Sequence, residues 1–512
     1  MDDAAANRVA MELDRMDPAS AFRAGIEMLK ADRPEALLLP AQRLAERHPG
    51  DHRPAQLLGL AARAAGDGPL ACAAFAAAAR NAPTDPLITH SRARTALEAG
   101  KPAVQLFKRA LDQSPNDGSV IQGLAAAMVS EGMADDASQL LSRTLAANPL
   151  WLDGHRTYAQ IRAQFGKDPL TSIGAALTIH ARDQSLHQLR ISLLLQANRA
   201  ADALEAAELA MDELGAAPWL TLLGGHAASE IGQKARADAY FAQSGTEHAP
   251  DARALLARHA VRFGRFEQVE PLAMSRSGSL DHSSVPYLAL AWRQLGDPRY
   301  DWLEGSSALV GIYDLADEIA DLHALAEHLR RLHFAQAAPI DQSVRGGTQT
   351  DGNLLLRDEE PLIQLRKVLL QAVDRHIAKL PPAIAGHPHL IARRKPSRIA
   401  GSWSVRLGGA GFHVDHVHSE GWLSSAFYVA LPQRGSGASC DMAAAQNLES
   451  CPGWLSLGES RDLAPAVSPV QLIEPKPGRL ILFPSGMWHG TRPFPAGERL
   501  TVAFDIARPR QN

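Results

Sequence analysis

The sequence predicts two successive architectures: an α-solenoid of paired helices, followed by a domain of short antiparallel β-strands. Three observations support this prediction. Glycines recur at nearly constant spacing along the first part of the chain, and prolines recur between them, about half a repeat away. After about residue 340 the helical spacing of apolar residues gives way to the two-residue alternation that is typical of strands.

Composition places the chain among ordinary globular proteins and argues against two classes of partner, nucleic acids and membranes. Of its 512 residues, 46% are hydrophobic and 21% are charged, and the formal net charge is −4. Without a strong basic field, no nucleic-acid partner is expected. The acidic start does not resemble a signal peptide, and no apolar run is long enough to span a membrane, so we expect a cytoplasmic protein with no membrane partner. The three cysteines form no C-x-x-C pair and are expected to be free thiols, with a link between Cys440 and Cys451 as the alternative.

The glycine repeat has the period of stacked helix pairs. Its intervals are 34, 32, 34, 66, 32 and 32 residues, and Asn198 stands near the middle of the double interval. Glycine and asparagine both tolerate the left-handed conformation that ends a helix, so each of them is expected to mark a turn. The glycine markers are Gly66, Gly100, Gly132, Gly166, Gly232, Gly264 and Gly296.

Prolines mark the second kind of turn, in segments such as 48–51 (HPGD), where one helix stops before the next begins. A repeat of two helices with these markers and a period near 34 resembles the tetratricopeptide repeat. The resemblance implies a superhelix over residues 20–310 whose concave face binds a peptide or protein partner. Residues 1–19 are expected to form an N-terminal segment, and residues 311–340 a helical linker.

The C-terminal domain is expected to span residues 341–512. An amphipathic helix over 360–380 ends at a Pro-Pro pair, and strand-like alternation follows. Short strands separated by glycine and proline turns favour a jelly-roll domain, that is, a double-stranded β-helix. The clearest strand segments are 402–407, 423–431, 479–483 and 499–506.

Metal-ligand side chains gather in two short segments of this domain. Residues 413–418 read HVDHVH, and a further histidine, His489, follows the strand at 479–483. Two ligands one residue apart, a distant histidine and an arginine beyond it are the layout of a non-haem iron site with open coordination positions. The two segments therefore predict a metal site.

Two pairs of side chains compete for the first two positions of this site. Alternate residues of a strand share a face, so His413 and Asp415 point one way, whereas His416 and His418 point the other way. Unless a bulge intervenes, one pair at most serves a single metal site. Periodicity alone leaves both pairs open.

Together, and in this order, the motifs resemble the 2-oxoglutarate/Fe(II) oxygenase family found behind tetratricopeptide repeats in bacteria. The likeness is carried by the strand at 402–406, the histidine pair with the strand after it, and the Phe-Pro-Ser turn at 483–485 that leads to His489 and Arg499. It covers about residues 340–510. The resemblance implies Fe(II) as the cofactor, and 2-oxoglutarate and O₂ as co-substrates.

In this family the recurrent first pair is His-x-His. The resemblance therefore implies His416, His418 and His489 as the metal ligands, with His413 and Asp415, which fit the general His-x-Asp pattern of oxygenases, as the alternative first pair.

Three further residues are expected to bind the co-substrate. Arg499 follows His489 by ten residues and can pair bidentately with the distal carboxylate of 2-oxoglutarate. Thr501 lies on the same strand face and adds a hydroxyl group. Tyr428, on the strand after the first ligand pair, can donate a hydrogen bond, although an aromatic at this spacing also suits the barrel core.

The expected activity is that of an Fe(II)- and 2-oxoglutarate-dependent dioxygenase that hydroxylates a peptide or protein substrate recruited by the repeat array. Two alternatives stay open. One is a three-histidine non-haem iron enzyme that does not use 2-oxoglutarate. The other is a repeat-type interaction adaptor whose metal-binding barrel is catalytically inactive. Residues 432–475 form an insertion whose role the sequence does not indicate.

Overall fold

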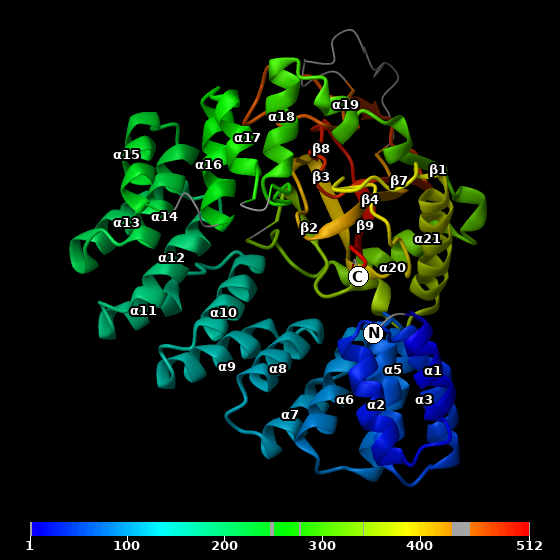
Figure 1. The fold of residues 1–512 in the computed structure, drawn as a ribbon. Helices are drawn as coiled ribbons and strands as arrows, with labels where there is room; N and C mark the ends of the chain where they lie inside the picture. The colour runs from blue at the N-terminus through cyan, green and yellow to red at the C-terminus, as the bar shows by residue number, and fades with distance from the viewer. Residues whose placement is uncertain (1–2, 246–249, 276–277, 341, 433–450, 511–512) are drawn as a thin grey trace.

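Two architectures follow one another along the chain: an arc of helices and a curled antiparallel β-sheet (Figure 1). The computed structural model describes residues 3–245, 250–275, 278–340, 342–432 and 451–510. The predicted fold class is confirmed. Within these residues, no helix is long and apolar enough to cross a membrane.

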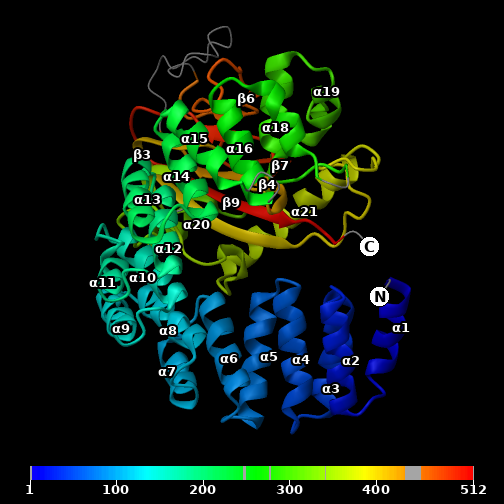
Figure 2. The same cartoon turned by 60° about the vertical axis from the view of Figure 1, so that its left-hand side comes forward.

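Helices α1 to α19 form the arc, and each packs mainly against its neighbours in the chain (Figure 2). The expected N-terminal segment contains α1. The helices are α1 (Asp3–Leu13), α2 (Pro18–Lys30), α3 (Glu35–Arg47), α4 (His52–Ala64), α5 (Gly68–Asn81), α6 (Pro86–Glu98), α7 (Val104–Gln113), α8 (Gly118–Ser130), α9 (Ala134–Ala147), α10 (Leu152–Gln164), α11 (Thr171–Ile179), α12 (Gln184–Gln196), α13 (Ala200–Leu214), α14 (Pro218–Glu230), α15 (Lys234–Ser244), α16 (Pro250–Arg262), α17 (Val269–Ala273), α18 (Val285–Leu295) and α19 (Arg299–Leu303).

The marker residues of the repeat adopt the backbone conformation that the sequence predicts. The seven glycine markers have φ angles between 66° and 82°, and Asn198 has a φ of 57°. After each marker, the next N–H donates to a carbonyl five residues earlier, as from Asp67 to Ala62 at 2.8 Å and from Lys101 to Ala96 at 2.9 Å. This is the Schellman geometry that closes the C-terminus of a helix. The markers therefore end helices, as predicted.

Gly132→Ala is expected to lower the free energy of unfolding by about 1 to 2 kcal/mol, because a Cβ is strained in the left-handed region. No atom lies within 4 Å of a Cβ built at Gly132, so the cost is conformational. Gly174→Ala, inside α11 and equally uncrowded, is the matched control and should stabilise by about 0.5 to 1 kcal/mol. Chemical denaturation followed by circular dichroism measures both variants, and effects of the same sign would contradict this account.

The C-terminal domain is one curled sheet, which bends along its long strand, β3 (Ile399–His416). Its first half pairs with β9 and its second half with β8, and Ala410, with a φ of 63°, lies between the two halves. The strand order is β1-β7-β4-β9-β3-β8-β5-β6, with β2 paired to β3. The other strands are β1 (Gly311–Asp314), β2 (Val344–Gln349), β4 (Gly421–Ala430), β5 (Leu455–Leu457), β6 (Gln471–Ile473), β7 (Arg479–Pro484), β8 (His489–Thr491) and β9 (Arg499–Ala507).

The segment expected as a helical linker, residues 311–340, contributes to the sheet domain. It contains α20 (Leu322–Leu332), but it also contains β1, which pairs with β7 at the edge of the sheet. Buried side chains of α20 and of α21 (Glu360–Lys379) share one apolar cluster with β4, β7 and β9. This cluster is the core beneath the sheet.

The arc contacts the sheet domain near both of its ends and along its middle (Figures 1 and 2). Near its start, Glu35 accepts hydrogen bonds from Arg398 at 2.6 and 2.7 Å. In the middle, Lys101 pairs with Asp358 at 2.5 Å. Further contacts, described below, join α16 and α18 to the sheet domain. The solenoid and the sheet domain therefore form one assembly.

Two of the three cysteines lie among the described residues. Cys72 is free and buried. Cys451 is disulfide-bonded, so the expectation that all cysteines are free thiols is wrong. Cys440 lies outside the described residues, as does most of the first half of the 432–475 insertion, and the second half contributes β5 and β6.

Candidate metal centre

A small pocket of about 50 Å³ lies within the curled sheet. Side chains of β3, β4, β8 and β9 line it, and Gln342 and Ser343 border it just before β2. The predicted residues His413, His416, His418, His489, Arg499 and Thr501 all contribute to this lining. Parts of the chain that are distant in sequence are thus brought to one site.

Three of these histidines are close enough to share one metal ion. His416 ends β3, His418 follows it by two residues, and His489 begins β8. One ring nitrogen from each lies within 4.8 Å of the other two. Among the described residues, no other group of three or more His, Cys, Asp or Glu side chains meets this condition.

Hydrogen bonds fix the tautomers of two of the three rings. The Nδ1 atom of His416 lies 2.8 Å from the carbonyl oxygen of Val414, and that of His489 lies 3.0 Å from the carbonyl oxygen of Met487. A carbonyl oxygen only accepts, so each Nδ1 must carry the proton. The lone pair of each ring is therefore on Nε2, as metal-ligating imidazoles require.

A carboxylate fixes the third ring. The Nδ1 atom of His418 donates to Asp505, whose two oxygens lie at 2.9 and 2.7 Å. Ser424 donates to the same carboxylate at 2.6 Å. Asp505 thus orients the ring and places a negative charge directly behind it.

Burial keeps the rings neutral. Removal from water, with a smaller contribution from the neighbouring His418, lowers the pKa of His416 to about 3. Removal from water, reinforced by the neighbouring histidines, holds the pKa of His489 well below its ordinary value. Both rings are therefore lone-pair donors at neutral pH.

A bulge brings His413 into the same pocket as His416. His413 pairs with Thr491 of β8, and His416 pairs with His489, so β3 has one more residue than β8 between these pairs. The extra residue changes the simple alternation of faces. Ser343 lies within 3.0 Å of His413 Nδ1 and 3.2 Å of His416 Nε2.

Asp415 is engaged elsewhere. Its carboxylate accepts hydrogen bonds from the backbone N–H of Arg461 at 2.8 Å and from the guanidinium at 2.6 and 2.5 Å. A Cβ built at Gly490 would lie 2.1 Å from Asp415 Oδ1, so only glycine fits beside this carboxylate. Asp415 does not line the pocket.

Arg499 is a buried cation at the edge of the pocket. It begins β9, is 3% exposed, and donates to the carbonyl oxygen of Gly453 at 2.7 Å. Its Nε has no hydrogen-bond partner among the described residues, and no carboxylate among them forms an ion pair with it. Burial lowers the pKa of Arg499, because removal from water penalises the charged guanidinium. An anion in the pocket would offset this penalty.

Tyr428 packs beside Arg499 in the buried core but does not line the pocket, whereas Thr501 does. The Arg499 guanidinium lies 5.0 Å from the centre of the Tyr428 ring, and the buried Tyr428 hydroxyl has no hydrogen-bond partner within the described part of the chain. Thr501 lines the pocket two residues after Arg499. An arginine N–H, a phenol and a threonine hydroxyl are together suited to an oxygen-rich anion.

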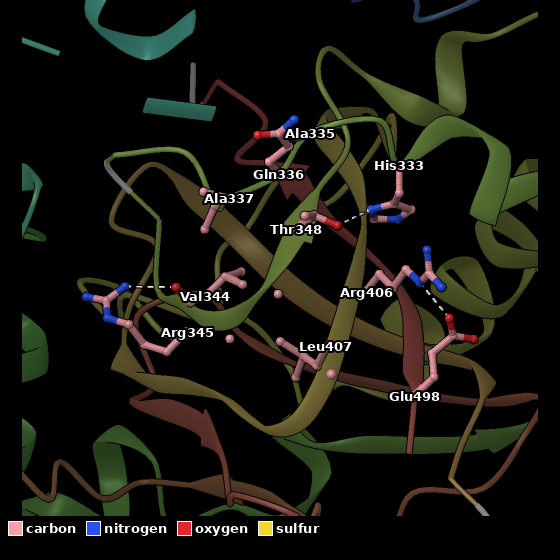
Figure 3. Close-up of a pocket in the computed structure, with 14 residues that line it drawn as sticks. His333, Ala335, Gln336, Ala337, Val344, Arg345, Thr348, Arg406, Leu407 and Glu498 are labelled. Atoms are coloured by element: carbon pink, nitrogen blue, oxygen red, sulfur yellow. Dashed lines mark hydrogen bonds and ion pairs between the residues drawn. The ribbon is translucent and has the colours of Figure 1, made fainter. Parts of the chain in front are cut away.

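A larger cavity, of about 630 Å³, lies along β2 and contains none of the predicted site residues (Figure 3). Its polar lining is already paired: His333 lies 2.8 Å from the Thr348 hydroxyl, and Arg406 donates to Glu498 at 2.5 Å. The chemistry-bearing residues are thus in the smaller pocket.

Asp505 and Ser343 are site residues that the sequence analysis did not identify. Asp505 lies on β9 at the same alternation as Arg499 and Thr501, so the period of the strand could have indicated it. Ser343 lies directly before β2, outside the segments that carry the oxygenase motifs, and no sequence pattern indicates it.

Comparison with known families agrees with this architecture. Residues 401–505 match the family model described as "Putative 2OG-Fe(II) oxygenase", and residues 96–161 match a tetratricopeptide repeat model. The chain joins a tetratricopeptide repeat region to a 2OG-Fe(II) oxygenase domain. The oxygenase match contains His416, His418, His489 and Arg499, and it ends at Asp505.

Three solved structures share limited similarity with this chain. MamA from Desulfovibrio magneticus is 15% identical, with a TM-score of 0.29, over 33% of this chain and 98% of its own. A prolyl-4-hydroxylase from Pseudomonas putida is 16% identical, with a TM-score of 0.25, over 40% of this chain and 95% of its own. A 2OG-Fe(II) oxygenase family member from Burkholderia pseudomallei is 14% identical, with a TM-score of 0.26, over 40% of this chain and 86% of its own. No protein of curated function matches the chain.

Proposed function

We propose that this protein is an Fe(II)- and 2-oxoglutarate-dependent dioxygenase that hydroxylates a peptide or protein substrate recruited by the repeat region. One observation carries the proposal. Three imidazole nitrogens converge in the pocket that also contains a buried arginine without a carboxylate partner among the described residues.

The donor set suits Fe(II). Imidazole nitrogen is a ligand that iron accepts, and three protein ligands leave coordination positions for small molecules. We infer that His416, His418 and His489 are these ligands. Three neutral ligands leave the full charge of the ion uncompensated, and the nearest negative charge is the Asp505 carboxylate that holds His418. An anionic co-substrate would supply the rest.

The arginine suits the co-substrate. We infer that Arg499 binds the distal carboxylate of 2-oxoglutarate, assisted by Thr501 and by the unpartnered hydroxyl of Tyr428. The remainder of the lining mixes apolar side chains, among them Trp403 and Phe483, with polar ones such as Gln349. A bound iron would supply the reaction of O₂ with 2-oxoglutarate, in which one oxygen atom enters succinate as carbon dioxide leaves and the other enters a C–H bond of the substrate.

A further cavity, between the repeat region and the oxygenase domain, supports a peptide or protein substrate. A space of about 540 Å³ opens between helices α6 to α10 of the repeat region and the 350–357 segment of the oxygenase domain. Its lining mixes apolar side chains, such as Ile161 and Phe334, with the charged Glu98, Lys101 and Arg331. Such mixed surfaces between stacked repeats suit peptide segments.

The test is anaerobic addition of Fe(II) and 2-oxoglutarate to the full-length protein, with the visible charge-transfer band of the chelate as the readout. The band is expected in the wild type and also in Asp415→Asn, which removes the charge of Asp415 but can still accept from Arg461. A wild-type spectrum with no band would exclude the dioxygenase and favour the interaction adaptor. A band lost only in Asp415→Asn would restore the His413 and Asp415 ligand pair.

A further inference from the structure

The last helices of the solenoid, α16 to α18, pack against the oxygenase domain beside the metal-ligand candidates. Buried apolar side chains of α16, α17 and α18 form one cluster with side chains of the oxygenase domain. We call this the joint cluster. Its members from the oxygenase domain are Leu463, Ala464, Val467 and Trp488, and Val417 packs against it.

Val417 and Trp488 are the chain neighbours of the metal-ligand candidates. Val417 stands between His416 and His418, and Trp488 directly precedes His489. Successive side chains of an extended segment point in opposite directions, so a neighbour buried outside the barrel holds the histidine beside it toward the pocket.

The contact made by Trp488 is specific as well as apolar. Its side chain is 4% exposed, and its indole N–H donates to the carbonyl oxygen of Pro286 in α18 at 2.9 Å. Its ring packs edge-on against that of Tyr287, with 5.9 Å between the centres. An indole that is anchored at both its ring and its N–H has little freedom to move.

Ion pairs make a second connection between the same two parts. Arg262 of α16 donates to Asp462 at 2.7 Å. The residue before Asp462, Arg461, holds the Asp415 carboxylate through its backbone N–H and its guanidinium. Asp415 directly precedes His416, so a chain of contacts runs from the solenoid to the first ligand.

We propose that α16 to α18 position the metal ligands, with Trp488 and Val417 as positioning residues, so that metal binding and the order of these helices are coupled. This inference rests on the ligand set of the proposed function. Metal affinity depends on how firmly the groups behind the ligands hold them. Because such coupling is reciprocal, bound metal must also stabilise the helices that position its ligands.

The first test compares Fe(II) affinities by anaerobic titration of full-length variants. Trp488→Phe keeps a ring but removes the hydrogen bond to Pro286, and Arg262→Ala removes the ion pair with Asp462. Each is expected to weaken Fe(II) binding about 10- to 100-fold. Glu35→Ala is the matched control, since it removes another ion pair between the solenoid and the oxygenase domain, the one with Arg398, at a point that does not adjoin the ligands. Its Fe(II) affinity should equal that of the wild type.

The second test needs no substitution, so it stands even if a variant fails to fold. Amide hydrogen exchange of the wild type is measured with and without Fe(II). Slower exchange in α16 to α18 on adding metal, with α4 to α6 unchanged, supports the proposal. Wild-type affinity in both variants, or unchanged exchange in α16 to α18, overturns it and leaves the metal site itself standing. A wild type that binds no Fe(II) overturns both.

Discussion

His418→Ala is expected to weaken Fe(II) binding by at least about 100-fold, and to abolish conversion of 2-oxoglutarate to succinate at micromolar iron. The variant removes one of three neutral donors. It also leaves the Asp505 carboxylate without the ring N–H that now lies 2.7 Å from it. An uncompensated charge of this kind typically costs about 3 to 5 kcal/mol when it is buried.

The matched control for this variant is His413→Ala. It removes the same type of side chain from the same pocket, but from outside the group of three converging nitrogens. Its Fe(II) affinity is expected to stay within a few-fold of the wild type. Anaerobic titration with Fe(II) and a succinate assay measure both variants. If His413→Ala lost iron and His418→Ala retained it, the ligand set proposed here would be wrong.

Arg499→Gln is expected to weaken 2-oxoglutarate binding by about 100-fold or more, and to leave Fe(II) affinity unchanged. The guanidinium is buried, and its Nε lacks a partner among the described residues, so we expect it to meet the co-substrate carboxylate through charge-assisted hydrogen bonds. Glutamine offers an N–H donor but no charge, and the carboxylate would enter a buried site without a counter-ion.

Titration of 2-oxoglutarate into the Fe(II)-loaded protein, followed through the chelate band, measures this effect. Arg406→Gln serves as the control, because Arg406 is a half-exposed arginine paired with Glu498 outside the pocket. It should bind 2-oxoglutarate as the wild type does. Unchanged 2-oxoglutarate affinity in Arg499→Gln would favour the three-histidine iron enzyme that does not use this co-substrate.

Features that depend on local backbone preference could be predicted from the sequence. The left-handed turns at Gly66 and its equivalents are such features, and Asn198 could be recognised because asparagine tolerates the same conformation. The alternation that predicts strands is local too. The strand at 311–314 could not be predicted in this way, because it is short and gains its hydrogen bonds from β7, far along the chain.

The candidate site was only partly predictable for the same reason. Residue type and spacing indicated His416, His418, His489 and Arg499. The presence of His413 in the same pocket depends on a bulge opposite β8, which is a property of strand pairing. The engagement of Asp415 depends on an arginine 46 residues farther along the chain.

The contacts between the solenoid and the oxygenase domain also limit how this protein can change in evolution. Open repeat arrays lengthen readily when a repeat is duplicated, since each unit touches only its neighbours. Here Glu35 near one end and Arg262 near the other both contact the same domain, so the arc is closed into a ring. An added helix pair would push the two contact points apart. The two contact points therefore fix the distance that the array must span, and with it the number of repeats.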